Sequence, residues 1–178
     1  NNSKMSIVEK VTKTRVTLKE VFSNEWDTSI MPDLSNNEVE KMYLTAIEKD
    51  GFYMPAYTAL VNFYNRHNLQ EKSITLLKTV IVTYPDTPDF HHLLGQTYFS
   101  KSAYSEAIKA YNKAIAIDST YVKSTQNLGY SQLENNQIED SQANLIASSQ
   151  SDAFGNRQKE ISAYVLTMAK NKLQFGKP

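Results

Sequence analysis

Apolar residues along the chain follow a helical pattern. In the clearest segment they stand at Ala107, Ile108, Tyr111, Ala114 and Ile115. This spacing places them on one broad face of an α-helix, and such a helix must bury that face against another element. Similar spacings continue over residues 20–155, so the pattern predicts an all-α fold.

The helical pattern recurs with a period of about 34 residues. The pair Leu94-Gly95 returns as Leu128-Gly129, and Leu60 holds the same register one step earlier. We expect the two glycines to mark places where neighbouring helices approach closely. A period of this length is typical of stacked helix pairs. We therefore predict four units, each with a helix A, a tight turn and a helix B, at residues 20–53, 54–87, 88–121 and 122–155.

Polar residues mark the predicted start of helix B in each unit. An acceptor side chain stands three residues before a carboxylate, which is the arrangement of a capping box. The pairs are Ser35 with Glu38, Asn68 with Glu71, and Asn136 with Glu139, and Ser102 holds the equivalent position in the remaining unit. We predict that these residues are N-caps.

These residues resemble the tetratricopeptide-repeat (TPR) family, whose unit carries Trp-x2-Leu-Gly-x2-Tyr, then Ala-x3-Phe, then Pro. The third unit matches most closely, through Ala-Tyr-Ser-Glu-Ala-Ile at residues 103–108. The resemblance covers about residues 20–155, although the first unit has Asp27 and the second Val61 where the family prefers a small residue. It implies a right-handed superhelical solenoid of antiparallel helix pairs.

The two ends of the chain differ from the repeat. Residues 1–16 show no helical spacing of apolar residues, which is typical of a flexible lead-in or a strand-like arm. We predict that residues 1–19 form a flexible N-terminal segment, and we assign it no function. After Gly155, residues 156–178 place Ile161, Tyr164 and Val165 on one helical face. Because the last unit of a solenoid exposes an apolar face, we predict that this segment is a C-terminal capping helix followed by a tail.

The resemblance implies that helices A line a concave groove, where a partner peptide or helix is held. By register, we expect nine residues to form this partner-binding groove. They are Thr58, Asn62, Arg66, His92, Gln96, Phe99, Gln126, Tyr130 and Leu133.

One TPR subclass binds the C-terminal carboxylate of heat-shock chaperones through Lys, Asn and Arg side chains at five groove positions. Only Asn62 and Lys123 match that set in this sequence, because Thr58, Leu93 and Asn127 occupy the other three positions. The groove instead offers amide, hydroxyl and aromatic groups. We therefore expect the partner to be a protein or peptide that is neutral or mixed in charge.

Composition removes several classes of partner. The chain has 19 basic and 19 acidic residues, so it lacks the positive field that nucleic-acid binding requires. No apolar run approaches the length of a transmembrane segment. The absence of cysteine excludes disulfides and thiolate metal sites. The chain does not begin with methionine and shows no signal sequence, which suggests a trimmed or processed form. Its compartment stays open.

Few residues suggest chemistry. His91 and His92 are adjacent, and adjacent helical residues do not share a face, so a histidine metal site is not expected. Glu139 and Asp140 suit a helix N-terminus, where the helix dipole favours them. No phosphate loop or nucleophile elbow occurs. We expect no catalytic residue, no metal and no cofactor, and hence no enzyme.

The sequence therefore favours a non-catalytic protein-interaction module, a scaffold or adaptor. Two alternatives stay open. The chain could be a structural subunit that self-associates through the edges of the solenoid, or the regulatory portion of a larger protein. The partner's identity and the oligomeric state do not follow from the sequence.

Overall fold

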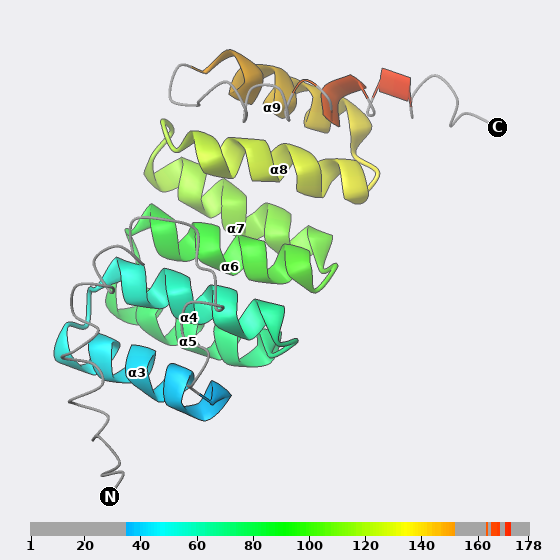
Figure 1. The fold of residues 1–178 in the computed structure, drawn as a ribbon. Coiled ribbons are helices and arrows are strands. Elements are labelled where there is room, and N and C mark those ends of the chain that lie inside the picture. Colours follow the sequence, from blue (N-terminus) through cyan, green and yellow to red (C-terminus); the bar gives the residue numbers. More distant parts are fainter. Residues whose placement is uncertain (1–34, 152–162, 164, 168–169, 172–178) are drawn as a thin grey trace, which may run out of the picture. The chain divides into compact units, whose positions relative to one another are not determined.

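The computed structural model describes residues 35–151, 163, 165–167 and 170–171 of the 178-residue chain. Its helices are α3 (Asn36–Lys49), α4 (Met54–Arg66), α5 (Gln70–Thr83), α6 (Pro88–Ser100), α7 (Tyr104–Ile117), α8 (Val122–Glu134) and α9 (Ile138–Gln150) (Figure 1). The described residues contain no strand. The all-α prediction is confirmed.

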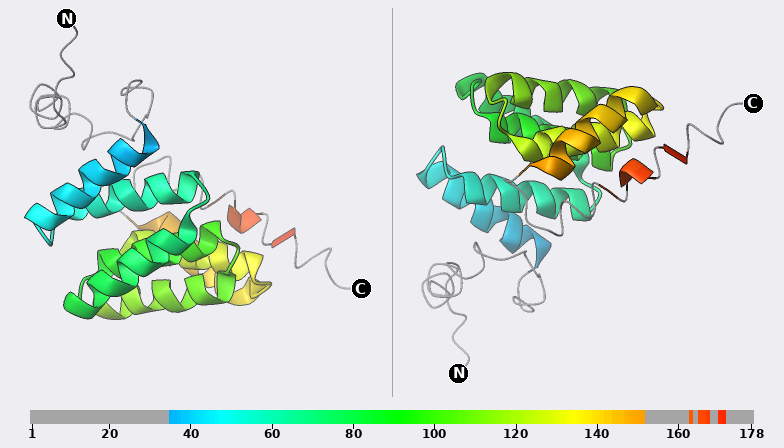
Figure 2. Two further views of the ribbon diagram at one scale, coloured as in Figure 1. Left: turned by 90° about the horizontal axis from the view of Figure 1, so that it is seen from below. Right: turned by 90° about the horizontal axis from the view of Figure 1, so that it is seen from above.

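Packing divides the chain into two compact units, of which the first ends at Leu60 and the second begins at Val61, inside α4. Within the second unit, α5 packs on α6, α6 on α7, α7 on α8, and α8 on α9. Figure 1 shows α6 to α9 following one another in chain order, and Figure 2 shows the same helices from below and from above. This is the stacking of consecutive helix pairs that the period predicts.

The helices fall in the predicted register. α4, α6 and α8 hold the positions of helices A, while α3, α5, α7 and α9 hold those of helices B. Helix A of the first predicted unit and the segment 1–19 lie outside the described residues. The division into four units at the boundaries given above stays a prediction.

The start of α3 confirms one predicted cap. The Glu38 carboxylate accepts hydrogen bonds from the backbone N–H and from the hydroxyl of Ser35, each at 2.9 Å. The acidic residue thus satisfies an N–H that would otherwise lack a partner at the helix start. Val39 and Tyr43 form the buried face of this helix.

The other predicted N-caps have a different role. Asn68, Ser102 and Asn136 have φ values of 57°, 59° and 62°, in the left-handed region, and each is followed by the residue that precedes helix B. None of the three helices B has a side-chain cap hydrogen bond. The periodic signal is real, but it marks the turn after helix A rather than the first residue of helix B.

The same hydrogen bond closes helix A at each of these turns. The N–H of the residue after the left-handed position donates to a carbonyl five residues earlier, at 2.8 to 2.9 Å. The pairs are Leu69 to Tyr64, Ala103 to Tyr98, and Gln137 to Gln132. This is the bond of a Schellman motif, which satisfies a terminal helix carbonyl and needs a left-handed residue just before the donor.

Ser102 is the one member of this set that is neither glycine nor asparagine. A left-handed conformation costs an ordinary L-residue about 1–2 kcal/mol, and glycine avoids that cost. We expect Ser102→Gly to raise the free energy of unfolding by about 1 kcal/mol and the melting temperature by roughly 2–4 °C. Ser119→Gly, at an exposed turn position without positive φ, serves as the control and should give no gain when both are melted side by side.

The two glycines of the Leu-Gly repeats lie where helices A and B meet. A Cβ atom at Gly95 would stand 2.5–2.8 Å from ring atoms of Tyr111, and one at Gly129 would stand 2.9 Å from Cγ of Leu145. Tyr111 and Leu145 occupy matching positions on α7 and α9, and both are fully buried. The prediction that these glycines permit close approach is confirmed.

Part of the predicted capping helix is described. Residues 163, 165–167 and 170–171 are helical, and Val165 packs on the cluster of Leu133 and Ile138 at the turn between α8 and α9. The capping role of this segment stays a prediction. Most of the remaining segment 156–178 lies outside the described residues.

Candidate functional site

A pocket of about 280 Å³ opens along helices A of the second unit. Three of its lining residues carry amides and three are aromatic. They are Asn62 of α4, Gln96 and Phe99 of α6, Tyr111 of α7, and Asn127 and Tyr130 of α8. Three consecutive helices A therefore contribute to one concave site.

The inner wall of the pocket is set by Tyr111. The ring of Tyr111 packs against Gly95, and Tyr111 is only 1% exposed. Its hydroxyl forms a hydrogen bond with the Asn127 amide. Burial raises the pKa of Tyr111, so the phenol stays neutral. The missing side chain at position 95 is what lets this aromatic residue reach the pocket from the helix B layer.

Two side-chain amides of the pocket make no hydrogen bond to other described residues of the chain. Within residues 35–151, the side chains of Asn62 and Gln96 have no hydrogen-bond or ion-pair partner. Asn62 is exposed and Gln96 is half-buried. By contrast, the nearby Asn65 and Asn127 amides are engaged with other side chains. The donor and acceptor groups of Asn62 and Gln96 remain available to a ligand.

The structure brings four of the nine predicted groove residues together in the pocket, namely Asn62, Gln96, Phe99 and Tyr130. His92, Gln126 and Leu133 are buried and do not line it. Arg66 is exposed at the end of α4, and Thr58 belongs to the first compact unit.

Sequence reasoning missed Tyr111 and Asn127 as pocket residues. The sequence pattern predicts Tyr111 as a core residue, and the structure confirms that it is buried. It also contributes to the pocket lining. Asn127 follows Gln126 directly on α8, and the predicted groove row was displaced by one residue there. The available signal was that Asn127 falls on one of the five positions used by the carboxylate-binding TPR subclass.

Polar contacts between repeats hold the walls of the pocket in register. The Ser73 hydroxyl donates to Asn65 Oδ1 at 3.2 Å, and Asn65 Nδ2 donates to the Thr97 hydroxyl at 3.3 Å. Thr97 in turn donates to the carbonyl of Leu93 at 3.0 Å. Thr97 is fully buried, so this chain of bonds fixes the spacing of α4, α5 and α6 where loss of a partner would be costly.

Two further contacts join α6 to the start of α8. A hydrogen bond of 2.8 Å links His92 Nδ1 to the Ser124 hydroxyl, and the Tyr121 hydroxyl donates to Asp89 Oδ1 at 2.6 Å. The ring of His92 also lies 5.5 Å from that of Tyr111. His92 therefore packs beneath the pocket as an internal residue that positions α8 and Tyr111.

Burial lowers the pKa of His92 from 6.5 to about 4, with a smaller contribution from the positive charge of Lys123, while Asp89 acts in the opposite direction. At neutral pH the imidazole is uncharged. Neutral Tyr111 of the lining therefore packs against an uncharged neighbour.

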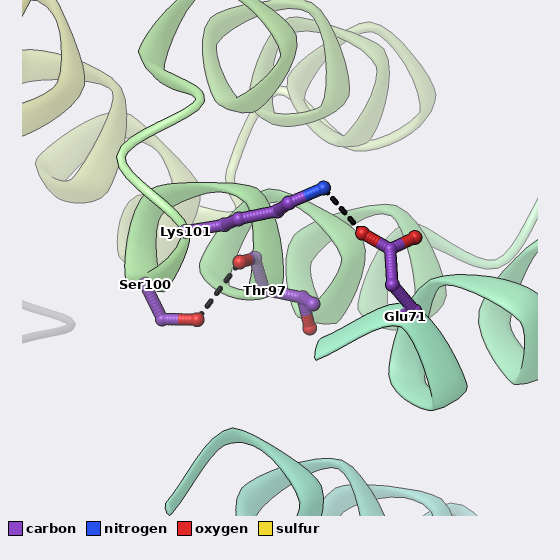
Figure 3. A network of polar contacts seen from close by, with 4 residues as sticks. All are labelled: Glu71, Thr97, Ser100 and Lys101. Carbon is purple, nitrogen blue, oxygen red and sulfur yellow. Dashed lines mark hydrogen bonds and ion pairs between the residues drawn. The ribbon is translucent and has the colours of Figure 1, made fainter. Parts of the chain in front are cut away.

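An exposed ion pair lies at the end of α6. Figure 3 shows the Lys101 ammonium reaching the Glu71 carboxylate at the start of α5, and the Ser100 hydroxyl donating to the Thr97 carbonyl at 2.8 Å. The hydrogen bond that Lys101 donates to the Glu71 carboxylate raises the pKa of Lys101. Because both side chains are well exposed, this pair adds little stability. Lys101 is thus paired with Glu71 and does not line the pocket.

Within the part of the chain that the structure describes, no charged side chain lines the pocket. Among the described residues, no three histidine, cysteine, aspartate or glutamate side chains are grouped so that they could hold a metal ion. None of the helices described is long and apolar enough to cross a membrane. What the site offers chemically is hydrogen bonding by amides together with contact to aromatic rings.

A family model described as "TPR repeat" matches residues 95–136, from the Gly95 position of α6 to the turn after α8. These residues match a tetratricopeptide repeat. No curated protein matches it. The likeness to known TPR proteins therefore comes from the repeat model and from solved structures.

Three solved TPR structures are similar in fold. The second TPR domain of human RPAP3, in complex with the HSP70 peptide SGPTIEEVD, is 16% identical with a TM-score of 0.55, covering 62% of this chain and 92% of that one. The first TPR of Spaghetti (RPAP3), bound to the HSP90 peptide SRMEEVD, is 15% identical with a TM-score of 0.58, covering 76% and 95%. The Yersinia enterocolitica translocator chaperone SycD is 13% identical with a TM-score of 0.58, covering 85% and 98%.

Proposed function

We propose that this TPR chain is a non-catalytic protein-interaction module that holds a peptide or helix of a partner protein against helices A. The observation that carries the proposal is the pocket, in which Asn62, Gln96 and Tyr130 recur at the same register position of α4, α6 and α8. A row built this way can contact successive residues of one ligand, as solenoids commonly do on a concave face.

The solved structures support an interaction role. Two of the similar domains are bound to chaperone peptides, and the third is itself a secretion chaperone. The low sequence identities mean that the likeness concerns the fold, so the ligand of this chain must be argued from its own pocket.

A test replaces Asn62, Gln96 and Tyr130 by alanine together. Central interface residues typically lose more than about 1–2 kcal/mol of binding energy on truncation, so captured partner should fall at least tenfold. The two amide changes should each alter the free energy of unfolding by no more than about 0.5 kcal/mol, because these groups have no internal partner. The measurement is capture of a partner by the wild-type and variant chains, followed by titration of that purified partner, with circular dichroism melting as the folding check.

Asn112→Ala is the matched control, because Asn112 is exposed on α7 and does not line the pocket. It should bind as the wild type does. Undiminished binding by the folded triple variant would reject the groove as the functional site. Light scattering at several concentrations then decides whether the chain instead self-associates, as the structural-subunit alternative requires.

A further inference from the structure

Building on the proposed interaction function, we propose that the pocket is selective for an extended, uncharged internal segment of a peptide, with one apolar or aromatic side chain as its anchor. The proposal excludes a free C-terminal carboxylate and an acidic anchor as ligands of this site. It rests on the size, charge and hydrogen-bonding groups of the pocket.

Size limits what enters. Pockets that hold a drug-sized molecule or cofactor usually enclose roughly 300–1,000 Å³. This pocket has about 280 Å³ and is lined by residues from three helices A and one helix B. It therefore accommodates one large side chain with its flanking peptide groups, while the rest of a ligand would run along the surface.

Charge limits the ligand further. Among the described residues, none of the side chains that line the pocket is charged, Tyr111 is held neutral by burial, and the neutral ring of His92 packs against that of Tyr111. A carboxylate or ammonium entering the pocket would lose part of its hydration without meeting an opposite charge among these side chains, which disfavours its binding. An anionic C-terminus of the kind found in the chaperone peptides has no partner in this lining.

The available amides favour a backbone in extended conformation. Each side-chain amide of Asn62 and Gln96 offers donors and an acceptor, as a peptide group does, and neither is used internally. An extended peptide exposes its N–H and C=O groups, whereas a helix pairs them internally and would leave these amides unmatched. The repeat therefore provides paired hydrogen-bonding sites for consecutive parts of an extended main chain.

The aromatic residues supply the anchor contact. Phe99 and Tyr130 are both half-buried in the lining, so each presents part of its ring to the pocket. Aromatic side chains favour offset or edge-to-face contact with another ring and also bury aliphatic surface well. An apolar or aromatic side chain of the ligand would pack against Phe99 and Tyr130, while the amides bind the peptide groups on either side of it.

Two displayed libraries of short random peptides test the proposal on the complete chain. One library ends in a free carboxylate, and the other is flanked on both sides by a fixed neutral linker. We expect the flanked library to yield binders that share an uncharged apolar or aromatic position. A synthetic copy of such a binder, amidated at its C-terminus, should keep its affinity in fluorescence anisotropy.

Three changes should each weaken that synthetic peptide at least tenfold. They are aspartate at the anchor position, N-methylation of the peptide bond next to it, and Asn62→Ala with Gln96→Ala in the protein. Asn112→Ala should leave the dissociation constant unchanged.

Enrichment only in the library with a free carboxylate, with acidic residues at its end, would overturn the selectivity while leaving the groove function intact, provided the amide variant still loses binding. Binders that are indifferent to the amide variant and to the triple groove variant would overturn both proposals. Tolerance of N-methylation would contradict an extended backbone held by the amides.

Discussion

Gly95→Leu is expected to lower the free energy of unfolding by about 3 kcal/mol, which corresponds to roughly 6–12 °C in melting temperature for a chain of this size. Even the first added carbon would stand 2.5–2.8 Å from the ring of Tyr111. That ring is fully buried and its hydroxyl is hydrogen-bonded to Asn127, so displacing it would disturb the core packing and break this bond. Thermal melting followed by circular dichroism measures the effect.

Gly129 provides the matched comparison. A Cβ there would meet Cγ and Cδ2 of Leu145 at 2.9 and 3.0 Å, and an aliphatic side chain can shift more readily than a packed ring. Alanine also favours the helix over glycine by about 1 kcal/mol. Gly129→Ala should therefore be nearly neutral, whereas Gly95→Ala should cost about 1–3 kcal/mol. An unchanged melting curve for Gly95→Leu would show that helices A and B do not meet at this residue.

The sequence predicted the helix pairs because its strongest signal is also the strongest packing constraint. A Leu-Gly pair can recur at a fixed period only if each repeat brings its helices together at the same position, and Gly95 and Gly129 meet this condition. The family resemblance added the identity of helices A as the groove walls. Four of the predicted groove residues line one pocket, and three of them, Asn62, Gln96 and Tyr130, are spaced by the same period.

The helix starts were predicted less well because asparagine has two roles. It is favoured at N-caps and is also the residue other than glycine that best tolerates a left-handed backbone. At Asn68 and Asn136 the second role holds, and helix B begins later than the capping pattern indicated. A carboxylate three residues further on does not distinguish the two cases, whereas at Ser35 the hydrogen bonds to Glu38 do.

The orientation of His92 could not be predicted from its own helix. Its position on α6 falls in the predicted groove row, and the decisive contact comes from Ser124 on α8, in the next repeat. Packing between repeats thus turns a predicted groove residue into an internal one. The sequence places a residue on one side of a helix, but the neighbouring repeat decides whether that side is open.

His92 also makes stability sensitive to acid. Its pKa is lowered from 6.5 to about 4 in the folded chain, mainly by burial and then by Lys123, against the opposing charge of Asp89. Below pH 6.5 the unfolded chain binds a proton that the folded chain does not. The contribution of His92 to the free energy of unfolding is therefore fully present above about pH 6.5. It is lost progressively as the pH falls and stops changing near pH 4. The total loss is about 3 kcal/mol, from the shift of the pKa.

Urea unfolding at a series of pH values between 7 and 4, with wild type and His92→Asn in parallel, isolates this contribution. Asparagine is smaller, so the variant should be less stable at pH 7, but its amide can still bond to the Ser124 hydroxyl and does not titrate. The gap between the two proteins should then narrow by about 1.4 kcal/mol per pH unit below pH 6.5, because only the wild type is penalised for excluding a proton. Parallel stability curves would mean that His92 titrates alike in the folded and unfolded chain. In that case burial would not exclude the protonated imidazole, and the interpretation of His92 as a neutral internal residue beside Tyr111 would be wrong.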